Sequence, residues 1–224
     1  MPFAASMAVV LAAILPARVG GTEPMPRAML AIARRPAEPA FAPMTERRAV
    51  DWAKNLPALT IENPNTRAIA TIKLYADDGT VDPPSFDSFK LLVGDGHNHP
   101  APMNRRVVQL LVKAAAHFDA KHVVVVSAYR PGRRGGPHAH GVAIDFKLPG
   151  TSSRTLAAYL RTLPRVGVGI YTHPQTQYVH LDVRETSWHW VDASPPGRTW
   201  REAPLPDKDR VARDATYSPA IDLP

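Results

Sequence analysis

The distribution of apolar residues along the chain predicts an ordered central region that contains several strands. Residues 67–75 (RAIATIKLY) alternate and lead into the turn 77–79 (DDG), which predicts the first arm of a hairpin. The continuous apolar run 123–126 predicts a buried central strand. Residues 143–148 (AIDFKL) and 178–183 (YVHLDV) alternate as well, so each strand is expected to hold its polar side chains at fixed positions.

Helical periodicity occupies three stretches around these strands. Residues 46–56 (ERRAVDWAKNL) follow a threonine cap, and residues 104–118 (NRRVVQLLVKAAAHF) place apolar side chains along one face. Ser152 or Ser153 is expected to cap a third helix that runs to about residue 163. Strands interrupted by helices in this manner predict an α+β domain.

Glycine and tryptophan mark the last part of the ordered region. Gly167 and Gly169 interrupt a predicted strand, and the missing side chains allow either a close backbone approach or a bulge. Trp188 and Trp190 follow, and two interpretations remain open for them: they form the floor of a cleft, or they pack in the core.

The two ends of the chain differ in composition from this region. Residues 3–15 form an uncharged apolar run that is too short to span a bilayer and fits a signal peptide over residues 1–21. No Lys or Arg precedes Arg18, so a loose apolar arm is the alternative. Residues 22–44 read as a Pro/Ala-rich linker, and the single domain is expected over residues 45–190. These features predict a periplasmic or secreted protein.

Beyond the predicted domain, residues 191–224 are rich in proline and charge. This composition predicts a C-terminal tail that either wraps around the domain or is mobile, with Trp200 as its one large anchor.

Composition limits the partners and the chemistry. The 224 residues include no cysteine, which excludes disulfides, a thiolate zinc site and a cysteine-anchored lipoprotein. The formal net charge of +7 favours an acidic partner, such as nucleic acid, an anionic membrane or a carboxylate-rich cell wall. The basic residues are scattered and form no stripe interleaved with aromatic residues, so we expect no nucleic-acid binding. We also expect no stable membrane span, and a monomer.

Three residues in the central region suggest a metal site. His138 lies in a Gly-rich loop, Asp145 on the following strand and His180 on a later strand. Two imidazoles and a carboxylate make a three-ligand zinc site that leaves a fourth position open for water. A lone Asp145 would be costly to bury among apolar residues, so it needs a metal or a partner. The alternative partner is Arg130, in a core ion pair.

Asp182 and His140 complicate this metal site. Asp182 lies two residues after His180 and points to the same face, where it could orient a ligand, act on the water or cap the turn. The spacing His138-Ala-His140, together with Asp145, imitates the metal motif of a cupin-type barrel. Neighbouring Pro and Gly place this motif in a loop, and the helix after residue 153 interrupts the strands that a barrel requires.

Two further sequence patterns say little about which residues bind a metal. His97-Asn-His99 lies in a Gly/Asp/Pro loop and is interpreted as solvated polar sequence. The chain has no HExxH, so the usual helix-borne zinc protease motif is absent.

The combined motifs resemble the LAS group of zinc peptidases. They are SxYR at 127–130, HxxGxAxD at 138–145, and VHLD at 179–182 followed by a Trp. This group includes D-alanyl-D-alanine metallopeptidases, murein endopeptidases and hedgehog-type domains, and the chain is most similar to the periplasmic murein endopeptidase branch over residues 67–190. The resemblance implies a small antiparallel sheet with helices on one side, and zinc bound by His138, Asp145 and His180. It also implies that Arg130 binds a substrate carboxylate or carbonyl.

The predicted function is zinc-dependent hydrolysis of peptide bonds in peptidoglycan stem peptides or cross-links. Many members carry Glu or His as the catalytic base where this chain has Gln177, which cannot take a proton from water. Asp182, His140 or His173 would then serve, with Asp182 the candidate for catalytic base or ligand orienter. The alternative is a non-catalytic, zinc-stabilised domain that binds cell wall or a protein partner.

Overall fold

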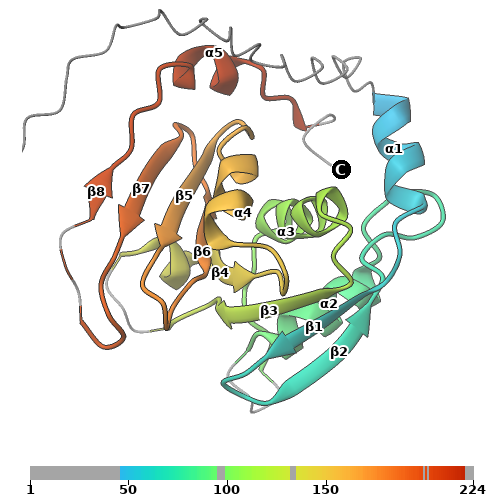
Figure 1. Ribbon diagram of the computed structural model, residues 1–224. Helices are drawn as coiled ribbons and strands as arrows, with labels where there is room; N and C mark the ends of the chain where they lie inside the picture. The colour runs from blue at the N-terminus through green and yellow to red at the C-terminus, as the bar shows by residue number, and fades with distance from the viewer. Residues whose placement is uncertain (1–45, 95–98, 132–134, 199, 201, 220–224) are drawn as a thin grey trace, which may run out of the picture. The chain divides into compact units, whose positions relative to one another are not determined.

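The computed structural model describes residues 46–94, 99–131, 135–198, 200 and 202–219 of the chain (Figure 1). The predicted signal peptide and linker lie outside these residues, as does His97. Within the described ranges, no helix is both long and apolar enough to cross a membrane.

The described part of the chain builds a mixed eight-stranded sheet with the order β2-β1-β3-β4-β6-β5-β7-β8. The pairs β1–β3 and β5–β7 are parallel, and the other neighbours are antiparallel. The expectation of a small, antiparallel sheet is therefore wrong, although the α+β class is confirmed. The connection from β1 to β3 carries two helices, which is the kind of crossover that a parallel pair requires. The strands are β1 Leu59–Asn63, β2 Ala68–Ile72, β3 His122–Ser127, β4 Ala143–Lys147, β5 Val166–Tyr171, β6 Val179–Val183, β7 Trp188–Asp192 and β8 Ala203–Pro204.

The alternating run at 67–75 is the second arm of a hairpin and not the first. β2 pairs with the preceding strand β1, which the pattern had not indicated. β1 has only five residues and lies between Pro57 and Pro64, so its apolar signal is short and interrupted. The turn at 77–79 closes only an isolated bridge between Tyr75 and Val81.

Two helices begin at side-chain caps, of which Ser152 was one of the two residues predicted for α4 and Asn104 had not been predicted as a cap. Asn104 Oδ1 accepts a hydrogen bond from the Arg106 N–H at the start of α3, and Ser152 Oγ accepts one from the Thr155 N–H at the start of α4. α4 ends before Leu163, which is nevertheless buried. The helices are α1 Glu46–Lys54, α2 Pro83–Leu92, α3 Arg105–His117, the 3-10 turn η1 Pro137–His140, α4 Ser153–Leu160 and α5 Arg210–Ala215.

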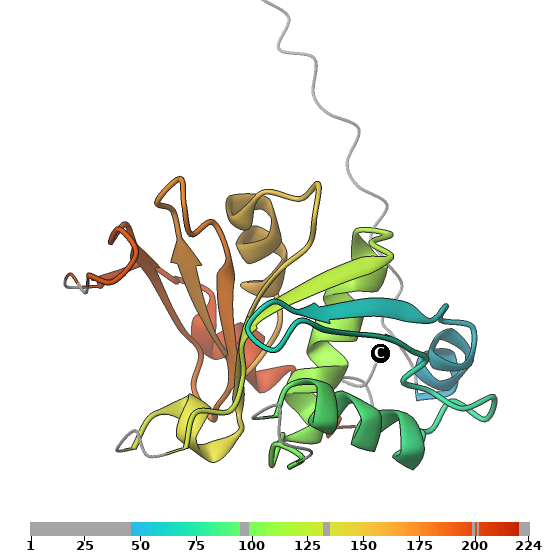
Figure 2. The same ribbon diagram turned by 90° about the horizontal axis from the view of Figure 1, so that it is seen from below.

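One face of the sheet carries the hydrophobic core. Helices α3 and α4 lie on the same side of the strands, and α4 packs against β5 and β6 (Figure 1 and Figure 2). Alternation in β4 and β6 sends Phe146 and Leu181 into this core, where both are fully buried. Phe89 of α2 belongs to the same core, so the prediction of helices on one side is confirmed for α2, α3 and α4. The polar residues between these apolar positions consequently face the opposite side of the sheet.

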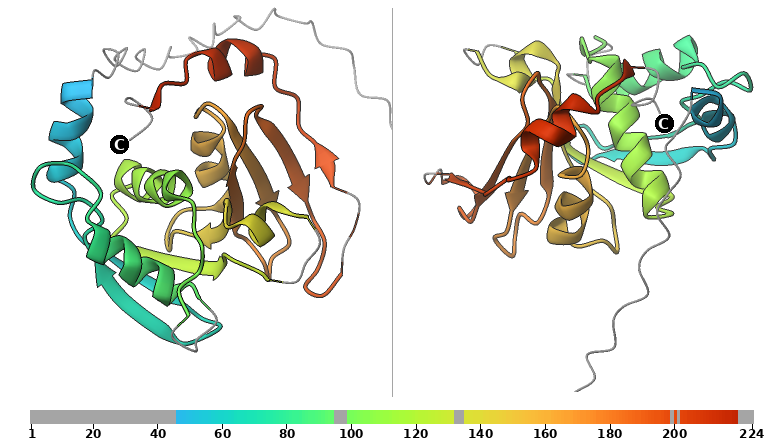
Figure 3. Two further views of the ribbon diagram at one scale, coloured as in Figure 1. Left: turned by 180° about the vertical axis from the view of Figure 1, so that it is seen from behind. Right: turned by 90° about the horizontal axis from the view of Figure 1, so that it is seen from above.

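The C-terminal segment is attached through buried polar contacts. Figure 3 shows α5 lying across one end of the strands. Asp214 accepts hydrogen bonds from the N–H groups of Arg165 and Ser187, both at 2.8 Å, and so joins the starts of the parallel strands β5 and β7. The Trp200 side chain is 56% exposed, so it does not provide the predicted anchor. Asp214 supplies an attachment that composition alone could not indicate.

Candidate metal centre

The centre lies on the face of the sheet opposite the helices. The register pairs Asp145 of β4 with His180 of β6, while Ser127 of β3 lies beside Asp145 and Gly169 of β5 beside His180. These residues form one row across four strands. Because side chains in paired positions share a face, the alternation recognised in β4 and β6 is sufficient to bring the acid and the histidine together.

His138 reaches the same place from the short turn η1. Gly141 ends this turn with φ of 66°, and a Cβ there would meet backbone atoms of Pro102, including the carbonyl carbon at 2.8 Å. His138 Nδ1 lies 2.5 Å from the Ala128 carbonyl oxygen, which accepts the ring N–H. Nε2 faces the centre and is therefore the ring nitrogen that can offer its lone pair to a metal.

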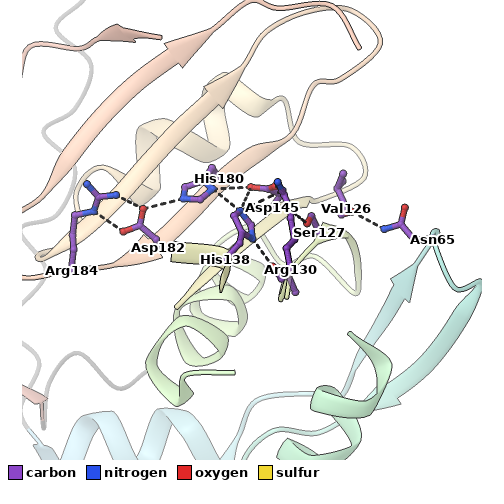
Figure 4. A network of polar contacts seen from close by, with 10 residues as sticks. Asn65, Val126, Ser127, Arg130, His138, Asp145, His180, Asp182 and Arg184 are labelled. Carbon is purple, nitrogen blue, oxygen red and sulfur yellow. Dashed lines mark hydrogen bonds and ion pairs between the residues drawn. The ribbon is translucent and has the colours of Figure 1, made fainter. Parts of the chain in front are cut away.

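The side chains of His138, Asp145 and His180 point toward one another in Figure 4, and their candidate ligand atoms lie within 4.8 Å of one another. His180 Nδ1 lies 2.8 Å from Asp145 Oδ1, and His138 Nε2 lies 3.2 Å from both of these atoms. Ligand atoms about 2.0–2.1 Å from a tetrahedral ion lie roughly 3.3–3.4 Å apart. The observed spacing is slightly tighter, so a small outward movement of these side chains admits an ion. The residues therefore fit a metal with mixed nitrogen and oxygen ligation.

Burial and hydrogen bonding shape the protonation of the metal-free ligands. Burial alone would raise the pKa of Asp145, but hydrogen bonds from His138 and His180 hold it well below its ordinary value. Burial alone would lower the pKa of His180, yet its bonds to Asp145 and Asp182 raise it to about 9. The carboxylates thus favour a protonated His180, whose Nδ1 proton has to leave when a metal binds.

Asp182 contacts the nitrogen of His180 that points away from the three ligands. His180 Nε2 lies 3.0 Å from Asp182 Oδ2. Arg184 donates to both oxygens of Asp182, through Nε to Oδ1 at 2.6 Å and through Nη2 to Oδ2. Burial would raise the pKa of Asp182, but the bonds to His180 and Arg184 lower it. This carboxylate is ionised, braced on the side opposite the ligands and suited to orienting the imidazole.

Arg130 contacts the other oxygen of the ligand carboxylate. Its Nη2 donates to Asp145 Oδ2, and its Nε donates to Ser127 Oγ at 2.5 Å. Asp145 therefore directs Oδ1 to the histidines and Oδ2 to the arginine. The ion pair between Arg130 and Asp145, which was one of two alternatives, is present beside the metal-ligand geometry. The arginine side chain is 36% exposed, so it remains open to a bound molecule.

The two tryptophans differ in their surroundings. Trp190 is buried and its ring centroid lies 5.0 Å from that of His180. A Cβ on Gly169 would lie 2.6 Å from Trp190 Cε2, so the glycine makes room for a side-chain ring, whereas the sequence had suggested a close backbone approach or a bulge. Trp188 is largely exposed. Trp190 therefore packs beside a candidate ligand, whereas Trp188 belongs to the surface.

Several residues considered from the sequence do not join the cluster. His140 is exposed in η1, and the grouping of potential metal ligands among the described residues does not include it. Gln177 is exposed with φ of 40°, and His173 Nδ1 accepts the Gln175 N–H at 3.3 Å. The open mixed sheet also excludes the cupin-type barrel. Arg184 was not considered, and its position two residues after Asp182, just beyond the end of β6, was the only available signal.

The fold and these contacts define a candidate metal centre with three protein ligands. The family model described as peptidoglycan L,D-endopeptidase MepK matches residues 52–190, and the chain belongs to this family of peptidoglycan-acting metallopeptidases. The match confirms the resemblance to murein endopeptidases and spans all the candidate site residues. No curated protein and no solved structure matches the chain.

Proposed function

We propose that this chain is a zinc-dependent endopeptidase that cuts peptide bonds in peptidoglycan stem peptides or cross-links. The observation that carries the proposal is the convergence of His138, Asp145 and His180, each fixed by a second contact behind its ligand atom. The family description further favours a bond between an L- and a D-configured centre. We also propose that the sheet is related to that of hedgehog-type domains.

Zinc is the metal that best suits the donor set. Two imidazole nitrogens with one carboxylate oxygen form a common catalytic zinc arrangement, and the chain offers no thiolate. When bound, zinc polarises the scissile carbonyl and lowers the pKa of water from about 15.7 toward 7. His138, Asp145 and His180 would hold the ion, and the backbone carbonyl of Ala128 and the Asp182 carboxylate would keep both rings oriented.

Arg130 and Asp182 take different roles in this proposal. Arg130 is always protonated and would donate to a substrate carboxylate or to the developing oxyanion beside Asp145. Asp182 would act as the orienter of His180 and not as the base, because both of its oxygens are engaged behind the ring. Proton removal from water would then fall to His173 or His140, since Gln177 cannot accept a proton.

A purified, zinc-loaded protein tests the proposal directly. Cross-linked muropeptides should be cleaved, and mass analysis of the products identifies the bond. His138→Ala should leave the same substrates intact. Intact muropeptides after incubation with zinc-loaded wild-type protein would instead support the zinc-stabilised binding domain, against which the family membership argues. Because this substrate lies in the cell wall, we propose a periplasmic or secreted location.

A further inference from the structure

A second row of side chains lies beside the metal row on the same face of the sheet. Lys147 follows Asp145 by two residues in β4, and Tyr178 precedes His180 by two residues and lies just before β6. The register pairs Phe146 with Val179, so its continuation places Lys147 beside Tyr178. Two residues along a strand correspond to about 6.6 Å. The second row therefore lies next to the candidate ligands on the same face of the sheet.

The row continues across β3 and β1 in the same register. Lys147 lies beside Val124, and Val124 lies beside Glu62. Adjacent strands are about 4.8 Å apart, so Lys147 and Glu62 are separated by roughly 9.6 Å at the backbone. The row thus presents a cation near the centre, an apolar middle and an acid at the far side.

A groove of about 360 Å³ lies over this second row. Its lining includes Lys147, Tyr178, Val124 and Glu62, with Gln175 and Thr176 from the loop before β6. This volume falls within the range of about 300–1,000 Å³ that is typical of small-molecule sites. The groove and the metal centre share β4 and β6, so a peptide bound at the centre has the groove as its immediate neighbour.

The two charged residues of the groove, Glu62 and Lys147, differ in their ion pairs. Glu62 pairs with His122 at 3.1 Å. Lys147 is exposed, and its ammonium has no ion pair with any residue in the described ranges. The Tyr171 and Tyr178 rings stack with centroids 4.3 Å apart, which fixes the aromatic side of the groove.

We propose that the groove over Lys147 and Tyr178 is a substrate subsite that selects a stem-peptide residue with a free carboxylate. Lys147 supplies the charge and Tyr178 supplies a ring surface and a hydroxyl donor. The inference rests on the proposed function and adds the group recognised next to the scissile bond. A free carboxylate and its amidated form have the same shape, so discrimination between them depends on the cation.

The experiment uses two cross-linked muropeptides that differ only in whether that stem carboxylate is free or amidated. The zinc-loaded wild-type protein should have a KM about two- to fivefold lower for the free acid, which is the size expected of one solvent-exposed ion pair. Lys147→Gln should raise the KM for the acid to that of the amide, with kcat nearly unchanged. Lys147→Glu should reverse the preference.

Two controls isolate the subsite. Lys73→Gln removes the same charge from an exposed lysine paired with Asp77, and should keep the wild-type preference. Calorimetric binding of the same two peptides measures the subsite without turnover. A binding preference in a protein that cuts neither peptide would contradict the proposed hydrolysis and support the subsite. Equal binding of acid and amide by the wild type, or an undiminished preference in Lys147→Gln, would overturn the subsite.

Discussion

Gly167 lies directly opposite Asp182 in the β5–β6 pair, and a side chain on the glycine would overlap the aspartate carboxylate. A Cβ there would also lie 2.6 Å from Arg184 Nε. The absent side chain makes room for the Asp182–Arg184 pair, which in turn fixes the ring of His180. The metal-binding geometry therefore depends on a residue that touches no metal ligand.

Loss of this brace should weaken metal binding. Arg184→Ala and Gly167→Ala should each lower zinc affinity about 10- to 100-fold, because an imidazole that loses its carboxylate support is a weaker and less oriented ligand. Competition with a chromophoric chelator measures the affinity. Arg154→Ala, an exposed position on α4, and Gly136→Ala, where a Cβ meets nothing within 4 Å, are matched controls. Wild-type affinity in both test variants would show that Asp182 needs no brace.

The ligand assignment predicts a contrast between neighbouring histidines. His138→Ala and His180→Ala should contain little zinc and show no turnover, because a three-ligand centre loses an essential donor. His140→Ala should retain zinc, since His140 is exposed and lies outside the cluster. Metal content by mass spectrometry decides both points. Loss of zinc from His140→Ala comparable to that from His138→Ala would contradict the assignment.

Arg130→Lys separates a catalytic role from a structural one. The variant should bind zinc normally and lose about two to four kcal/mol of transition-state stabilisation, a hundredfold or more in rate, because an ammonium cannot present two parallel donors. Arg130 also binds Asp145 and Ser127, so the melting temperature has to be measured with the rate. Wild-type turnover in a less stable Arg130→Lys protein would assign the arginine to the fold alone.

The site was more predictable than the sheet that carries it. Alternation around Asp145 and His180 is a local signal, and it sufficed because the two strands are direct neighbours. The parallel pairings of β1 with β3 and β5 with β7 join segments that local patterns do not connect. Gly167 suggested a close backbone approach or a bulge, and the Asp182 side chain that fills the space could be identified only once the β5–β6 register was known.

The C-terminal segment was the least predictable part of the described chain. Asp207 and Asp214 belong to a charged stretch that resembles solvated sequence, yet both take part in contacts with the sheet. Such contacts depend on partners more than 15 residues away, so composition alone could not distinguish them from a mobile tail.

His189 contacts Asp207 of the C-terminal segment. Protonation of His189 should therefore make the free energy of unfolding depend on pH. This residue is 1% exposed on β7, and its Nδ1 accepts a hydrogen bond from Arg161 Nε at 3.2 Å. Burial lowers its pKa to about 4, with Asp207 opposing and Arg161 and Arg213 reinforcing the shift. The unfolded chain, with an ordinary histidine pKa near 6.5, therefore binds more protons than the folded protein between about pH 4 and pH 6.5.

The sign of the effect follows from this difference. The contribution of neutral His189 to the free energy of unfolding is fully present above about pH 6.5. It is lost as the pH falls toward 4, by up to about 1.4 kcal/mol per pH unit. Chemical denaturation of the zinc-free protein at pH 4.5 and pH 7 should show a smaller pH dependence for His189→Gln than for wild type. The other titrating groups are common to both proteins and cancel in the comparison. An equal pH dependence in the two proteins would mean that His189 is not held neutral in the folded state.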